Sequence, residues 1–276
     1  IGCVDGKSIQ ELGGDLIYLA PDGLRTIAGT ERIGDVELGT VSKQIQDRIA
    51  DIGTDNITST IIRSKSQYRL FFPQTAETEI LSKGIAAVLK ANPETGTLGF
   101  EYADIKGIKP SATDSFFISD TETIVHGGYD GYVYKQESGG VFTRATSTDT
   151  IRGFYRSPDM SLGDPGIRKS MQRALVNYKV GEAIDTTNQT FRLRYNFDDT
   201  NTPQPDAYSF SSAQVAAFYN SGVYGSSAYG SSGFPLERIS VEGSGFVVAF
   251  KLEDQSSKQA LSLRGFELEY VNGGRR

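Results

Sequence analysis

The chain of 276 residues is 38% hydrophobic and 11% aromatic, with 31 glycines and no Trp, which excludes a disordered or membrane-embedded protein and indicates a folded, turn-rich one. Its net charge of −6 is unevenly spread, because residues 1–150 hold 14 Lys/Arg against 21 Asp/Glu while residues 151–276 hold 14 against 13. The acidic first part argues against broad adhesion to nucleic acid, whose phosphates attract Lys and Arg.

The first residues bear on processing and redox chemistry. The chain begins with Ile1 rather than Met, so we expect a processed end or the start of an ordered fragment, with further residues before it. Cys3 is the lone cysteine, which excludes an intramolecular disulfide and fits a reducing compartment. No apolar run approaches the roughly 20 residues that span a bilayer, so the sequence predicts no membrane-spanning segment.

Two segments have the pattern of a β-hairpin with an Asp-Gly turn. They are LIYLAPDGLRTIAG, residues 16–29, and IVHGGYDGYVYKQE, residues 124–137. Each has an aromatic-rich run before the turn and an apolar run after it, which is the strongest short-range hairpin signal. Asp22 and Asp130 lie 108 positions apart, which leaves room for roughly two of the four-stranded repeats that build a β-propeller. Unrelated hairpins of an antiparallel sheet protein are the alternative.

The segment 41–52 gives the clearest helix signal. Its apolar residues recur at four- and three-residue spacing and therefore share one face. They are Val41, Ile45, Ile49 and Ile52. Ser42 or Thr40 is the expected N-terminal cap, and Gly53 follows the last apolar residue as a helix-ending glycine does. We expect this helix to cover one edge of a sheet.

Short strands follow the helix. The sequence predicts them at 59–64, 67–72, 84–91, 98–105 and 115–119, interrupted by Pro73, residues 93–96 and Pro110. Their lengths and the turn residues between them predict an antiparallel sheet, and the long helices that an α/β enzyme fold needs are missing. We therefore expect residues 1–150 to form β-propeller-like blades. The propeller is expected to be incomplete, because this length supplies about three blades and closed propellers have 4–8.

A polar stretch at 143–150 marks the exit from the first domain. The second domain, residues 151–276, is predicted to be a smaller antiparallel β-sandwich-like domain, so the whole chain is all-β. Its strands are predicted at 154–158, 168–179, 190–197, 238–242, 246–252 and 262–271. In the last of these, Glu267 and Glu269 alternate with apolar residues, which is typical of a sheet with one buried and one wet face.

Residues 200–233 combine proline, serine and glycine with Tyr219, Tyr224 and Tyr229. The composition predicts a long loop. Loops of this length are commonly mobile or functional, and Tyr with Ser and Gly suits adaptable contacts. We expect the three tyrosines to contact a partner or a neighbouring subunit, and a flexible surface loop is the alternative.

The polar residues give little support for catalysis. His126 is the only histidine, and it lies inside a hairpin strand with no nucleophile-elbow motif in the chain, so we expect a strand residue. One His and one Cys cannot build the usual zinc site, and Asp198-Asp199 lacks the spacing of a calcium loop and is expected to be a self-bonded turn. Glu267 and Glu269 are expected to be wet-face acids rather than a glycosidase pair. We expect no catalytic residue, no cofactor, no metal and no enzyme activity.

Five cations gather within 22 residues of the second domain. They are Arg152, Arg156, Arg168, Lys169 and Arg173. A turn at residues 164–165 would fold their two segments into one patch. Such a patch could make non-specific, salt-sensitive contacts with phosphates that pass through a pore. The alternative is a set of inter-subunit salt bridges with the acidic first part of a neighbouring copy.

The order of several features resembles a known family. The hairpin YDGYVYKQE is followed by IRGFYRSPDMSLGDPGIRKSMQRALV, RLRYNFDD, a glycine-tyrosine loop, VEGSGFVVAF and LRGFELEYVNGGRR. This order resembles the tail nozzle or hub (tail tubular) structural proteins of short-tailed bacteriophages, best over roughly the last 150 residues. The resemblance implies a β-propeller and a smaller β-domain in each subunit, and a ring of identical subunits through which DNA leaves the capsid.

The same resemblance implies a structural role in the virion tail, with assembly in the host cytoplasm. The expected partners are further copies of the chain and other tail proteins (adaptor, fibre or spike, needle), with transient, non-specific contact with passing DNA. Members of the family carry no catalytic residues to transfer. Two alternatives stay open: a receptor- or carbohydrate-binding tail protein whose tyrosine-rich loop stacks on sugars, and a propeller glycosidase.

Overall fold

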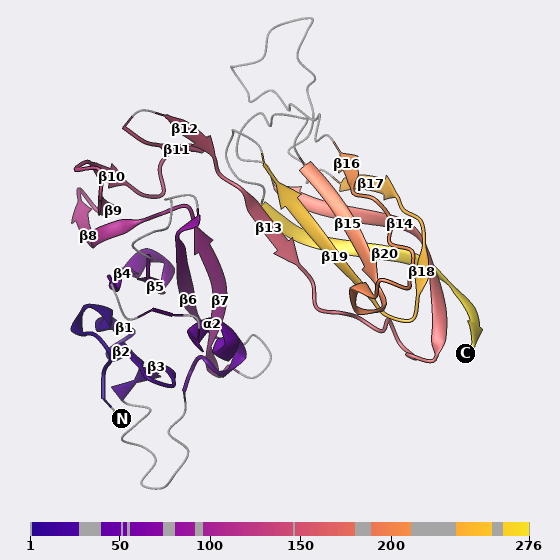
Figure 1. Ribbon diagram of the computed structural model, residues 1–276, viewed down its shortest axis with the longest axis horizontal. Helices are drawn as coiled ribbons and strands as arrows, with labels where there is room; N and C mark the ends of the chain where they lie inside the picture. Colours follow the sequence, from indigo (N-terminus) through magenta and orange to yellow (C-terminus); the bar gives the residue numbers. More distant parts are fainter. Residues whose placement is uncertain are drawn as a thin grey trace, which may run out of the picture. The chain divides into compact units, whose positions relative to one another are not determined.

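The computed structural model (Figure 1) describes residues 2–27, 40–50, 52–53, 56–73, 81–91, 96–145, 147–179, 189–210, 236–255 and 262–275. The chain divides into two compact units, Ile1–Ser138 and Gly139–Arg276. Strands make up 59% and helix 9% of the described residues, which confirms the all-β class. The sheets are antiparallel and none of those described closes on itself, so a propeller, partial or complete, is not confirmed. The boundary expected after Thr150 falls inside the second unit.

The first unit opens with a three-stranded meander. Its elements are the 3-10 turn η1 (Gly6–Ser8), β1 (Gln10–Leu12), β2 (Asp15–Ala20) and β3 (Gly23–Thr26). The predicted Asp-Gly hairpin is confirmed, because Ala20 pairs with Gly23 across a two-residue turn. Gly23 has φ +136°, and a Cβ there would lie 2.3 Å from Ser42 Oγ, so the position requires glycine.

The predicted helix is shorter than expected. A 3-10 turn, η2 (Lys43–Ile45), leads into α2 (Gln46–Ala50), and Ile49 is buried while the other three apolar residues of the stripe pack partly against the core. The stripe is therefore confirmed. The prediction that Ser42 caps the helix is wrong, because Ser42 Oγ instead accepts a hydrogen bond from Leu24 N at 2.9 Å. The hydroxyl ties the segment to β3 and leaves the first helical turn uncapped by this side chain.

A four-stranded meander follows, in the order β4-β5-β6-β7. Its strands are β4 (Thr58–Ile62), β5 (Gln67–Phe71), β6 (Lys83–Ala91) and β7 (Leu98–Lys106), with the 3-10 turn η3 (Arg63–Lys65) between β4 and β5. The four strands predicted here are confirmed to within a few residues. The hydrophobic core of the unit lies between this sheet, the first meander and α2, and includes Leu24, Ile49, Tyr68 and Ile85.

The third meander contains β8 (Pro110–Ile118), β9 (Thr121–Gly128) and β10 (Val133–Lys135). The predicted hairpin at Asp130-Gly131 is confirmed: Val133 pairs with Gly127, and Gly128 N donates to Tyr132 O at 2.8 Å. The strand predicted at 115–119 begins earlier than expected. Pro110 opens it next to a β-bulge instead of interrupting it, a position where a missing N–H is tolerated.

The first strands of the three meanders are joined by side chains, which we call the first-strand seam (Gln10, Ser59 and Thr113). Gln10 Nε2, on β1, donates to Ser59 O on β4 at 3.1 Å, and Thr113 Oγ1, on β8, donates to the same oxygen at 2.9 Å. Among the described strands, β4 pairs in its sheet with β5 alone, so its outer carbonyl needs other donors, and the neighbouring meanders supply them.

The second unit begins with a small hairpin and continues as two four-stranded sheets. The hairpin is β11 (Val141–Thr143) and β12 (Thr148–Thr150). One sheet has the order β13-β19-β15-β16, built from β13 (Gly153–Arg156), β19 (Val248–Asp254), β15 (Gln189–Tyr195) and β16 (Tyr208–Phe210). In the other, β14 (Ile167–Lys179) pairs with β17 (Leu236–Ser240) and β18 (Ser244–Gly245) on one side and β20 (Ser262–Arg275) on the other.

Both sheets of the second unit contribute to one hydrophobic core, so the unit is a β-sandwich (Figure 1). Phe250 on β19 shows this, since its ring centroid lies 5.5 Å from that of Phe191 in its own sheet and 4.2 Å from that of Phe266 in the other. Alternating side chains along β15 are buried, as expected for a strand with one face on a core.

Two predictions for the second unit need correction. The strand predicted at 190–197 ends at Tyr195, because the following turn η5 (Asn196–Asp198) has positive φ at each residue. Part of the predicted loop is strand, since Tyr208–Phe210 forms β16 against β15. On β20, Leu268 packs against the core as expected for the apolar face, whereas Tyr270 remains exposed.

No helix among the described residues is long and apolar enough to cross a membrane.

Candidate functional site

The five cations predicted to form a basic patch lie on both sheets of the sandwich. Arg156 is on β13 and Arg152 lies just before that strand, beside the sheet that contains β19 and β15. Arg168, Lys169 and Arg173 are on β14, in the other sheet. The structure therefore distributes these cations over two layers, and adjacent strands do not bring all five together.

Two of the β14 cations make contacts within their own unit. Lys169 is 2% exposed, and its Nζ donates to the carbonyl oxygens of Asp164 and Phe246. Its neighbour Arg168 points the opposite way, is exposed, and donates from Nε to Ser244 Oγ at 2.9 Å. Lys169 is therefore a buried structural cation that satisfies two carbonyls rather than a group available to a passing phosphate.

Glu267 and Glu269 lie on β20, the outer strand beside β14. Glu269 Oε2 is 3.3 Å from Arg173 Nη1, directly across the ladder between the two strands. Both partners are about half exposed, so this is a surface ion pair of small energetic weight. The arrangement fits the prediction of wet-face acids and also accounts for the third β14 cation.

His126 lies on β9, in the hairpin strand where the sequence places it. It is 7% exposed, and its ring centroid lies 5.3 Å from that of Tyr134 on the paired strand. Burial lowers the pKa of His126 because the imidazolium would lose its hydration, and the nearby Asp130 carboxylate opposes this only in part. The side chain is therefore neutral near pH 7 and packs as part of the sheet.

The Asp198-Asp199 segment forms the expected self-bonded turn. Asp199 Oδ1 accepts hydrogen bonds from Asn201 N at 3.0 Å and from Asn201 Nδ2 at 3.1 Å. Asp198 Oδ1 lies 3.1 Å from Arg194 Nε. Across the described residues, no group of three or more His, Cys, Asp or Glu side chains could hold a metal ion. Tyr219, Tyr224 and Tyr229 lie outside the described residues.

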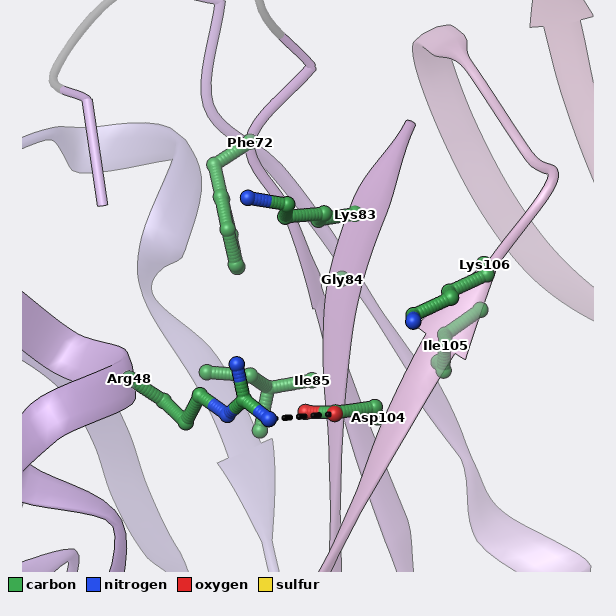
Figure 2. A pocket seen from close by; sticks show the side chains of 8 residues that line it. All are labelled: Arg48, Phe72, Lys83, Gly84, Ile85, Asp104, Ile105 and Lys106. Atoms are coloured by element: carbon green, nitrogen blue, oxygen red, sulfur yellow. Dashed lines mark ion pairs between the residues drawn. The ribbon is translucent and has the colours of Figure 1, made fainter. Parts of the chain in front are cut away.

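The first unit contains a pocket that sequence reasoning missed (Figure 2). Its cavity volume is about 50 Å³, and its walls come from α2, the end of β5, and the paired strands β6 and β7. We call it the cationic pocket. The residues that give it its chemical character are Arg48, Phe72, Lys83, Ile85, Asp104 and Lys106.

The register of the β6–β7 ladder builds the pocket. Lys83 pairs directly with Lys106, and Ile85 pairs directly with Asp104. Directly paired residues share a face of the sheet, as do residues two apart on one strand, so these four side chains project from the same face. Arg48 reaches the same place from α2 (Figure 2).

The lining of the pocket combines an apolar floor with a cationic rim. Phe72 and Ile85 are buried members of the core, whereas the side chain of Lys83 is exposed. Arg48 Nη2 lies 3.4 Å from Asp104 Oδ2 (Figure 2). Three cations therefore share the pocket wall with one carboxylate, and two of them, Lys83 and Lys106, are directly paired on the ladder.

The sequence carried a faint signal for this pocket. Lys83 and Ile85 lie two residues apart on one strand, as Asp104 and Lys106 do on the next, but only the register between the strands places them together.

The chain was also compared with known proteins. No protein-family model matches it, and no curated protein matches it.

Proposed function

We propose that this protein is an architectural subunit of a phage tail, part of a ring-shaped nozzle or hub that conducts DNA during ejection and carries other tail proteins. The observation that carries the proposal is the first-strand seam, which joins three consecutive meanders, followed along the chain by a separate β-sandwich. A propeller and a smaller β-domain in each subunit are what the family resemblance implies. In this proposal the protein is located in the virion tail and is assembled in the host cytoplasm.

The first unit supports an arc of propeller blades. Propellers repeat antiparallel sheets around an axis, so the first strands of neighbouring blades come together near that axis. Here β1 contacts β4, and β4 contacts β8, in the order of the chain. Three meanders are fewer than the 4–8 blades of a closed propeller. Closure would therefore use strands other than those of the three meanders.

The second unit supports assembly through sheet edges. β20 spans 14 residues and, among the described strands, pairs with β14 alone. Its other edge offers backbone N–H and C=O groups, next to the exposed apolar side chains of Tyr270 and Val271. Proteins normally cover or block such long edges because they attract other strands. In a closed ring of identical copies, each such contact is repeated around the ring, so individually weak contacts add up.

The proposal is tested in purified particles of the virus that carries this sequence. Quantitative mass spectrometry should find several copies of the chain per particle, and antibody labelling should place them at the tail. A particle without the chain, or with one isolated copy of it, would contradict the proposal.

A second candidate is a receptor- or carbohydrate-binding tail protein. The observation that favours it is a pair of exposed tyrosines at the tip of the β9–β10 hairpin, Tyr129 at 55% and Tyr132 at 56% exposure. Lys109 Nζ lies 5.2 Å from the ring centroid of Tyr129. Exposed aromatic rings beside polar groups suit stacking against sugars. A glycan-array signal that disappears in Tyr129→Ala/Tyr132→Ala would favour this role, and an array without signal would leave the nozzle proposal standing.

A further inference from the structure

We propose that the contact between the second and third meanders, which we call the meander joint, opens when His126 on β9 takes a proton. The joint is closed while this imidazole is neutral, and the third meander separates from the second as the imidazole becomes charged. The inference does not rest on the proposed tail function, because the joint lies within the first unit and its opening is measured on the chain alone.

The strand register places His126 in the meander joint. His126 pairs directly with Thr113 on β8 and with Tyr134 on β10. Directly paired residues share a face of a sheet. On this face, the Thr113 hydroxyl donates to Ser59 O on β4 at 2.9 Å, so the face is turned towards the second meander.

A second contact of the joint lies on the other side of His126. Gln136 N donates to Ile124 O at 2.8 Å, which continues the β9–β10 ladder by one residue. Because Ile124 is two residues from His126, Gln136 projects from the same face as the histidine. Gln136 Oε1 accepts a hydrogen bond from Arg69 Nη1 on β5. Contacts with β4 and β5 therefore flank the imidazole.

The surroundings of His126 disfavour a second proton. The side chain is 7% exposed, and Nδ1 has no hydrogen-bond partner among the described residues. At Gln136, the oxygen is already bonded to Arg69, and the buried Nε2, itself a donor, also lacks a partner in the described part of the chain. An imidazolium here would be a buried charge with an unpaired N–H, and both features are costly. Burial accordingly lowers the pKa of His126.

The charged groups of the joint do not offset that cost. They are Arg63, Lys65 and Arg69 from the second meander, and Glu122, Asp130 and Glu137 from the third. Glu122 accepts hydrogen bonds from two backbone N–H groups of η3, and Glu137 binds two of the cations. Asp130 is exposed at the hairpin tip and opposes the effect of burial on His126 only in part. The residues that β8 pairs on this face are uncharged.

Proton linkage gives the direction of the effect. Opening returns the imidazole to water, where its ordinary pKa is 6.5, whereas in the closed joint the pKa is lower. The contribution of neutral His126 to the closed joint is therefore fully present above about pH 6.5 and is lost as pH falls towards the folded value. In that range the ratio of open to closed joints rises by up to about tenfold for each pH unit.

Hydrogen exchange of the full chain between about pH 7 and pH 5.5 tests the proposal, with rates corrected for the intrinsic pH dependence of amide exchange. Protection of the β8, β9 and β10 amides should fall about three- to eightfold, while the β5 and β6 amides keep theirs. His126 is the only histidine, so its imidazole NMR signal is unambiguous and should titrate below pH 6.5. Glu237, whose pKa is raised by burial, lies on β17 of the second unit and does not affect this readout.

Two variants remove the proton site. His126→Phe keeps a ring stacked on Tyr134 but cannot take a proton, so protection of the third meander should stay constant over this range. His126→Gln is the second variant, in case the larger ring disturbs the packing, and should also show constant protection. Glu137→Gln is the matched control: it removes a carboxylate of the same joint that acts below about pH 4.5, so it should retain the wild-type loss.

Three results would overturn the proposal. The first is constant protection of the third meander in the wild-type chain between about pH 7 and pH 5.5. The second is an equal loss of protection in the wild-type chain and in both His126 variants. The third is an imidazole that titrates at or above pH 6.5, because the closed joint would then bind the proton at least as well as the open one.

Discussion

The two units of the chain hold their sheets together by different means. The sandwich has one core shared by both sheets and rich in aromatic side chains, such as Tyr178, Phe191 and Phe250. In the first unit, the main hydrophobic cluster joins the first two meanders and α2, and Ile124 of the third meander is buried outside that cluster. Polar contacts, which include the seam, join the third meander to the second.

This difference has an energetic consequence. Full burial of a large apolar side chain stabilises a fold by about 1.5–3 kcal/mol, at roughly 25 cal/mol per Å² of apolar surface. A hydrogen bond between neutral groups contributes about 0.5–1.5 kcal/mol net. We therefore expect the sandwich to unfold as one cooperative body, and the third meander to separate from the second at a lower free-energy cost.

The largest expected effect is in the sandwich core. Phe250 is 1% exposed and contacts aromatic rings of both sheets, so Phe250→Ala should lower the free energy of unfolding of the second unit by about 3–5 kcal/mol. Val271→Ala, at an exposed position of β20, is the control and should change little. Urea denaturation of both variants measures the difference. If both variants unfold at the same urea concentration, the stability of the sandwich does not depend on this core.

The next effect is at the polar attachment of the third meander. Arg69, on β5, donates from Nη1 to Gln136 Oε1 at 2.8 Å and from Nη2 to Glu137 Oε1. Arg69→Met keeps much of the volume but removes these bonds, so we expect a loss of about 2 kcal/mol. Lys65→Met, which removes the more exposed partner of Glu137, should cost less.

Hydrogen exchange tells whether that loss is local. In Arg69→Met, amides of β8, β9 and β10 should exchange faster while those of β5 and β6 stay protected. Faster exchange throughout the first unit would mean that the third meander is not a separable element.

A smaller effect is expected at the seam. Thr113→Val removes the hydroxyl that donates to Ser59 O while it keeps the shape of the side chain. The carbonyl retains its bond from Gln10, so the expected loss is about 1 kcal/mol. Chemical denaturation measures this loss of stability, and hydrogen exchange of the β8 amides shows whether it lies at the seam. A stabilised variant would contradict the role that we assign to the seam.

The smallest effect is a dependence on pH. Burial alone would raise the pKa of Glu137, but hydrogen bonds from Lys65 and Arg69 bring it below the ordinary carboxyl value of 4.5. A depressed folded pKa contributes stability that is fully present above about pH 4.5 and is lost as pH falls through the lower, folded value. Because Glu137 is about one-third exposed, we expect less than about 1 kcal/mol.

Glu137→Gln provides the check. As the pH falls below about 4.5, amides of the third meander should lose protection from hydrogen exchange in the wild-type chain. In the variant, the same amides should depend less on pH. An identical profile in the two proteins would show that this carboxylate does not stabilise the attachment.

Local signals in the sequence predicted local structure well. Both Asp-Gly hairpins form, because glycine accepts the positive φ of the turn, as at Gly131 with φ +85°. The helix was predicted too long because Ser42 was expected to cap its start. Nothing near Ser42 in the sequence reveals that its hydroxyl instead bonds to Leu24 on β3. Strand positions follow from alternation, but the partner of each strand edge does not.

The candidate sites depended on information that the sequence does not carry. Arg168 and Lys169 are adjacent in sequence, yet strand alternation exposes one and buries the other. The basic patch was predicted because its cations are close together in the sequence, but the sandwich places them on two different sheets. The cationic pocket depends on the register that pairs Lys83 with Lys106, and on the packing of α2 that adds Arg48.

Cryo-electron microscopy of the purified virus particle tests the central claim most directly. The account predicts a closed ring of identical copies at the tail, each with its three seam-linked meanders and its β-sandwich, around a channel wide enough for DNA. A chain that is absent from the tail, or one that occurs there as a single isolated copy, would contradict it.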